Sequence, residues 1–135
     1  MLARELARSD VVGWLRNVDR QSWSLEIPYE SGGNVVPMFP DLIVVRKQGK
    51  EYVFDILEPH NPSLGDNFEK AVGFAKFAEQ HGALFGRIEM LRAATGAAGS
   101  GKFVGLDFNQ SSVRQKVRLI TSNPQLDALF DSDAK

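Results

Sequence analysis

The stretch from Phe39 to His60, FPDLIVVRKQGKEYVFDILEPH, constrains the fold more than any other part of the chain. Two apolar runs rich in β-branched and aromatic residues flank a short polar segment at 47–49, which is the pattern of a β-hairpin. Each run carries one aspartate, Asp41 and Asp55. Because an unpaired charge is costly in an apolar environment, a buried hairpin must pair or neutralise both carboxylates.

The turn of this hairpin decides how the two aspartates lie. A three-residue connection over 47–49 would put Gly49 at a left-handed position and set Asp41 opposite Asp55, with Cβ atoms ~5 Å apart. A two-residue turn at 48–49 would shift the register by one and place the acids on opposite faces. Adjacent carboxylates repel unless a cation neutralises them, and Mg²⁺ or Mn²⁺ prefers such oxygen ligands. The alternative is one acid in solvent and one that accepts backbone hydrogen bonds.

Composition predicts one soluble domain over residues 1–135, either a whole protein or a domain excised from a larger one. The absence of cysteine excludes disulfides, thiolate metal sites and a cysteine nucleophile. A net charge of −1 gives no overall attraction to nucleic acid or acidic membranes, so any polyanion site must be local. We expect a cytoplasmic protein, because the N-terminal segment lacks the apolar run of a signal peptide and no stretch reaches membrane-spanning length.

Periodicity predicts the order helix, three strands, helix, two strands, and then two short helices. The segment at 111–120 also fits a strand period, but we assign it as a helix. The predicted helices cover 2–20, 63–81, 111–120 and the residues from Pro124 onward with Asn123 as cap; the predicted strands cover 22–29, the two arms of 39–60, 86–94 and 102–108.

A glycine-rich segment at 96–102, GAAGSGK, matches the glycine and lysine positions of a phosphate-binding P-loop. Phe103 stands where that motif needs a serine or threonine to hold Mg²⁺, and the segment leads into a predicted strand, not into a helix. We therefore interpret it as a connection between strands.

The large aromatic side chains are expected to fill the core. Helical spacing places Phe68, Phe74 and Phe77 on one predicted helix, and a base-stacking platform is the less favoured reading of them. We expect the same core role for Trp14 and Trp23.

Pro40 and Asp41, followed by Asp55 in the next strand within this order of elements, resemble the PD-(D/E)XK nuclease superfamily. The run PDLIVV…YVFDILEPH, followed by DNFEKAVGFAKFAEQHG, is similar to the C-terminal nuclease-like domain of prokaryotic type III restriction and DEAD/DEAH-helicase-like proteins. The resemblance implies an α/β, restriction-endonuclease-like fold with a central mixed sheet of four to five strands flanked by helices in αβββαβ order. It also implies Mg²⁺-dependent cleavage of DNA by an endonuclease module that works with helicase or translocase domains.

The same resemblance implies a set of metal ligands. Asp41, Asp55 and the carbonyl of Ile56 would hold Mg²⁺ or Mn²⁺, which would activate a water molecule and stabilise charge on the scissile phosphate. Leu57 occupies the position where the superfamily carries its lysine. Leucine can neither orient water nor stabilise a phosphate, so the motif is incomplete at this position.

Three residues could replace the missing lysine. Lys70, one turn into the following helix, is the first candidate, and Glu58 or His60 is the second. By strand alternation Glu58 points away from Asp55, so its participation requires the strand to end or bulge there. The alternative function is a degenerate nuclease fold that binds nucleic acid or protein without cutting.

Overall fold

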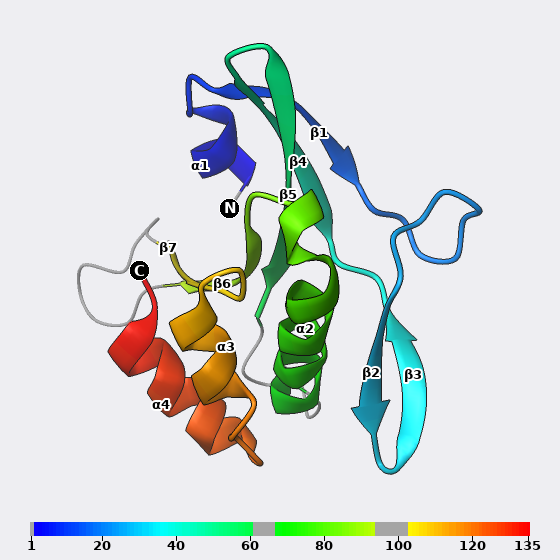
Figure 1. The fold of residues 1–135 in the computed structure, drawn as a ribbon, viewed down its shortest axis with the longest axis vertical. Coiled ribbons are helices and arrows are strands. Elements are labelled where there is room, and N and C mark those ends of the chain that lie inside the picture. Colours follow the sequence, from blue (N-terminus) through cyan, green and yellow to red (C-terminus); the bar gives the residue numbers. More distant parts are fainter. Residues whose placement is uncertain (1, 61–66, 94–102) are drawn as a thin grey trace.

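A computed structural model describes residues 2–60, 67–93 and 103–135 as an α/β fold with one five-stranded mixed sheet, a separate two-stranded hairpin and four α-helices (Figure 1). The helices are α1 (Leu2–Leu6), α2 (Asn67–His81), α3 (Ser111–Val117) and α4 (Asn123–Asp133), with a 3₁₀ turn η1 (Gly82–Leu84) after α2. The strands are β1 (Val11–Arg16), β2 (Ile27–Ser31), β3 (Asn34–Met38), β4 (Leu42–Gln48), β5 (Glu51–Pro59), β6 (Ile88–Ala93) and β7 (Phe103–Asp107).

The five-stranded sheet has the order β1-β4-β5-β6-β7, and only the β5–β6 pair is parallel. This pair is joined through α2, as a parallel pair requires a long crossover. The two faces of the sheet carry separate apolar cores. Ile56 belongs to the larger core, with Phe74 of α2, whereas the neighbouring Leu57 belongs to a smaller core with Leu2 of α1. Alternate residues of β5 therefore face α2 and α1 in turn.

The separate hairpin β2–β3 packs against α2. Its two-residue turn consists of Gly32 and Gly33, both with positive φ, as tight hairpin turns require. A Cβ added to Gly73 of α2 would lie 2.5 Å from the Cβ of Tyr29, so glycine at this position allows the helix and β2 to approach closely.

The sequence prediction was only partly right for residues 2–38. The expected helix over 2–20 ends at Leu6, and Val11–Arg16 forms an edge strand that pairs with β4 across a bulge. Two β-branched residues and a glycine open this segment, a composition that favours a strand over a helix. The expected strand over 22–29 begins only at Ile27, and the strand Asn34–Met38 was not predicted. Pro37 weakens the strand pattern of Asn34–Met38, because proline cannot donate a backbone hydrogen bond. A two-stranded sheet tolerates proline because each strand has a free edge.

The remaining elements agree with the prediction. Helices at α2, α3 and α4 and strands at β6 and β7 are confirmed, although the cap of α4 is Ser122, whose side chain accepts a hydrogen bond from the N–H of Gln125, and not Asn123. The predicted helix start at 63–66 and the glycine-rich segment at 96–102 lie outside the described residues. Within the described part of the chain, no helix is long and apolar enough to cross a membrane.

Candidate functional site

The β4–β5 turn sets the register that builds the site. It consists of Gly49 and Lys50, with Gly49 at φ +62° in the first turn position, so neither of the two turns considered from the sequence is the one formed. Val44 pairs with Asp55, and one step beyond the last ladder pair places Asp41 against Glu58. The predicted pairing of Asp41 with Asp55 is therefore wrong: the two acids lie on opposite faces of the sheet, as the shorter of the two turns would also have required.

Asp41, Glu58 and Lys70 line one cleft of about 260 Å³. Asp41 lies immediately before β4, Glu58 lies near the end of β5, and Lys70 lies in the first turn of α2. The backbone N–H of Asp41 donates a hydrogen bond to Oε1 of Glu58, at 3.2 Å. Three of the residues proposed from the sequence thus meet in one place; the cleft is completed by Phe39, Pro59, Asn67 and Met90.

Two acids and two bases act on one another at this cleft. Burial raises the pKa of Glu58 to about 7, and the neighbouring Asp41 carboxylate acts in the same direction, while Lys70 and the backbone N–H of Asp41 act against it. Asp41 itself is paired with Arg16, whose Nη1 lies 2.5 Å from its Oδ1. A carboxyl group with a pKa near neutrality in a cleft is a common mark of a functional site.

Asp55 occupies a different environment on the α1 face. It is fully buried and accepts hydrogen bonds from Arg46 (Nη2 to Oδ1, 2.9 Å) and from Arg87 (Nη2 to Oδ2, 2.8 Å). Arg87 also pairs with Glu5 of α1, at 2.8 Å. Burial alone would raise the pKa of Asp55, but the two guanidinium groups outweigh burial and hold this pKa below its usual range. Both carboxylate oxygens are engaged by protein, which is the arrangement of a structural ion-pair network.

Ile56 and His60, which were also proposed from the sequence, do not line the cleft either. The side chain of Ile56 is buried in the core, and its N–H donates to the carbonyl of Arg87. His60 is stacked on Phe130 of α4 with ring centroids 5.0 Å apart, and its Nε2 lies 3.5 Å from Oδ1 of Asp127. Burial lowers the pKa of His60 despite that carboxylate. The geometry therefore brings together Asp41, Glu58 and Lys70 and leaves Asp55, Ile56 and His60 elsewhere.

The cleft suits a hard divalent cation in donor chemistry, since both Asp41 and Glu58 line it. Nowhere in the described ranges do three or more histidine or acidic side chains gather in a way that could hold a metal ion. Asp41 and Glu58 would thus need backbone carbonyl, water or substrate oxygens to complete the coordination. Mg²⁺ commonly binds in this way, through one or two carboxylates together with waters and phosphate oxygens.

Two polar residues, one in the cleft lining and one paired with Asp41, were not foreseen from the sequence. Asn67 stands one helical turn before Lys70, so the spacing of three residues could have placed it on the same face of α2. Arg16 could not have been found in this way, because the sequence prediction put it in a helix and only the β1–β4 pairing brings it to Asp41.

Comparison with known proteins assigns the family. No curated protein and no solved structure matches this chain. A family model does match it, and the match spans residues 1–135. The chain therefore belongs to the YagJ family.

Proposed function

We propose that this protein hydrolyses phosphodiester bonds in DNA with the help of Mg²⁺ or Mn²⁺, and that Asp41, Glu58 and Lys70 form its active site. The observation that carries the proposal is the register of β4 and β5, which brings Asp41 and Glu58 into one cleft that a lysine also lines.

The element order supports a link to the PD-(D/E)XK superfamily. Without the β2–β3 hairpin, the chain runs α1, β1, β4, β5, α2, β6, which is the αβββαβ order that the sequence resemblance implies. With the observed register, the motif is better read as Pro40-Asp41 followed by Glu58-Pro59-His60. Glu58 then replaces Asp55 as the second acid, and Lys70 supplies the lysine from α2.

Each residue of the cleft has a distinct role in this proposal. Asp41 and Glu58 would hold the cation, which supplies a bound water of lowered pKa and positive charge beside the phosphate. Lys70 would contact the phosphate oxygens and orient the attacking water. Arg16 would release Asp41 when the cation binds, because its guanidinium is exposed enough to move into solvent. Helicase or translocase domains would present the DNA.

The alternative function is a nuclease-like domain that binds nucleic acid or protein without cutting. Two observations favour it: Arg16 already neutralises Asp41, and His60, the residue two positions after Glu58, is buried against Phe130 and does not line the cleft. This alternative predicts binding in the absence of cleavage under every metal condition.

A cleavage assay separates the two functions. The protein is incubated with plasmid DNA and with single-stranded DNA in Mg²⁺ or Mn²⁺, and the products are resolved on gels. We expect cleavage by the wild type and loss of cleavage in Asp41→Asn, Glu58→Gln and Lys70→Met. The matched controls are Lys76→Met and Glu79→Gln, which change exposed ion-paired residues of the same helix, α2.

The outcomes are distinct. Cleavage that persists in both Asp41→Asn and Glu58→Gln would place the active site elsewhere. A wild type that never cleaves but binds DNA in a salt-sensitive manner would favour the binding domain.

A further inference from the structure

We infer that an open strip of the sheet beside this cleft binds a single-stranded segment of nucleic acid and leads it to Asp41 and Glu58. The inference rests on the proposed function and narrows its substrate class. The open strip consists of residues from three adjacent strands: Leu15 of β1, Val45 and Lys47 of β4, and Tyr52 and Phe54 of β5.

The registers put these side chains on one face. Val45 pairs with Phe54 and with Gly13, Lys47 pairs with Tyr52, and Leu15 pairs with Ile43. Ile56, two residues beyond Phe54, lies in the core beneath α2, so the strip is on the α2 face of the sheet. Asp41 and Glu58 are on the same face, at the end of the hairpin away from its turn.

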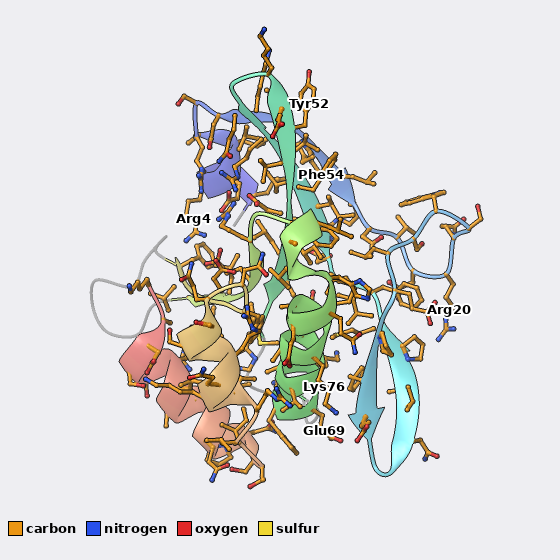
Figure 2. The ribbon with its side chains drawn as sticks, in the orientation of Figure 1. Arg4, Arg20, Tyr52, Phe54, Glu69 and Lys76 are labelled. Carbon is orange, nitrogen blue, oxygen red and sulfur yellow. The ribbon has the colours of Figure 1, made fainter. Side chains whose placement is uncertain are left out.

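The aromatic side chains of the strip are exposed although they lie on a central pair of strands. Tyr52 is 58% exposed and Phe54 is 44% exposed. Figure 2 shows both along β5, with Tyr52 toward the hairpin turn. They are two residues apart, so their Cβ atoms are separated by ~7 Å along the strand. Two rings so placed on an open sheet face can each stack on a base of an extended strand.

The charges of the strip favour a polyanion. Lys47 lies beside Tyr52, and Lys50 lies in the adjoining turn, whereas Glu51 pairs with Gln48 on the opposite face. On this face of the described β4–β5 hairpin, the only acids are Asp41 and Glu58, where the proposal places a cation. From Lys47 to Asp41 the strand spans ~20 Å, so a strand held at the lysine end can reach the cleft.

Unpaired bases fit this surface better than a duplex does. The faces of the bases are accessible in a single strand but are stacked on one another inside a duplex, where exposed aromatic rings find no partner. We therefore expect a preference for single-stranded DNA or RNA, or for a single-stranded end, over a blunt duplex.

Fluorescence anisotropy tests this inference without cleavage. The full chain is titrated, in EDTA, into a labelled oligothymidylate of about 15 nucleotides and into a blunt duplex of equal length. Stacking of one base on an aromatic ring contributes enough that Tyr52→Ala and Phe54→Ala should each weaken binding to the single strand about 5- to 100-fold. Tyr52→Phe should bind like the wild type because it keeps the ring.

Matched controls identify nonspecific effects. Leu119→Ala removes a large exposed apolar side chain outside the strip and should leave affinity unchanged. Lys47→Ala should reduce the slope of the logarithm of affinity against the logarithm of salt concentration by about one, as expected for the loss of one phosphate contact. Lys116→Ala should leave this slope unchanged.

Three binding results would overturn the inference: unchanged affinity in both aromatic variants, equal affinity for duplex and single strand, or absence of oligonucleotide binding. A dimer in sedimentation that Phe54→Ala dissociates would also overturn it, because the strip would then be a self-association surface. Failure of the proposed function looks different. A protein that binds single strands through Tyr52 and Phe54 but never cuts them supports the strip and refutes catalysis, whereas cutting that is insensitive to both rings refutes the strip alone.

Discussion

Replacing Asp55 with asparagine should destabilise the fold far more than the same change at Asp41. The carboxylate of Asp55 accepts hydrogen bonds from Arg46 and from the backbone and side chain of Arg87, and it is fully buried. Removing one partner of a buried ion pair leaves an uncompensated charge and costs about 3–5 kcal/mol. The Asp41–Arg16 pair is partly exposed, so its loss should cost ~1 kcal/mol or less.

Urea unfolding, followed by far-ultraviolet circular dichroism, measures both effects. With a denaturant dependence of about 2 kcal/mol per molar, Asp55→Asn should lower the unfolding midpoint by about 2 M and Asp41→Asn by ~0.5 M or less. Because the folded pKa of Asp55 is lowered, its stabilisation exists above the unfolded carboxyl pKa and is lost as pH falls toward the folded pKa. The gap between wild type and Asp55→Asn should therefore narrow in acid. Equal midpoints for the two variants at neutral pH would refute the assignment of Asp55 to a structural network.

Two further predictions concern residues around these sites. Between the unfolded pKa of Glu58 and its folded pKa of about 7, unfolding of the protein releases a proton from this carboxyl, so the stability of the wild type should fall as pH rises through this range. Glu58→Gln should be more stable than the wild type by about 2–3 kcal/mol at pH ~8 and equal to it at pH ~4. A difference in urea midpoint that does not change with pH would contradict the burial of this carboxyl. A Cβ at Gly86 would lie 2.5 Å from Nη2 of Arg46 and 2.6 Å from Oδ1 of Asp55, so Gly86→Ala should lower the free energy of unfolding by about 1–3 kcal/mol. Gly13→Ala should not show this overpacking loss, because no atom lies within 4 Å of the added Cβ. Thermal melts that rank the two variants in reverse would contradict the packing of the network.

The sequence predicted those parts of the fold whose local signals and tertiary environment agree. The helix at α2 and the strands β6 and β7 are apolar segments whose side chains pack into the larger core. The segment Leu2–Arg20 has an apolar pattern that fits a helix. Residues Val11–Arg16 instead pair with β4, so the tertiary pairing of this segment overrides the secondary structure that its apolar spacing favours. Trp14 and Trp23, expected in the core, are about half exposed for the same reason: the elements that would have buried them do not form.

The candidate site shows how much depends on one turn. Asp41, Glu58 and Lys70 were all among the residues proposed from the sequence, but their grouping was not, because a shift of the pairing register by one residue moves every side chain of a strand to the other face. The sequence pointed to Gly49 as the left-handed residue of the turn, which is confirmed. The local sequence does not determine whether that glycine is the first or the last residue of the turn. This position decides whether Asp55 or Glu58 lies opposite Asp41.

The proposed metal site is tested most directly by a crystal of the wild-type protein soaked in Mn²⁺, with the anomalous difference map measured near the Mn absorption edge. We expect a peak in the cleft between the carboxylates of Asp41 and Glu58, with the guanidinium of Arg16 displaced from Asp41. A peak at Asp55, or no peak in the cleft when the metal is present in excess, would contradict it.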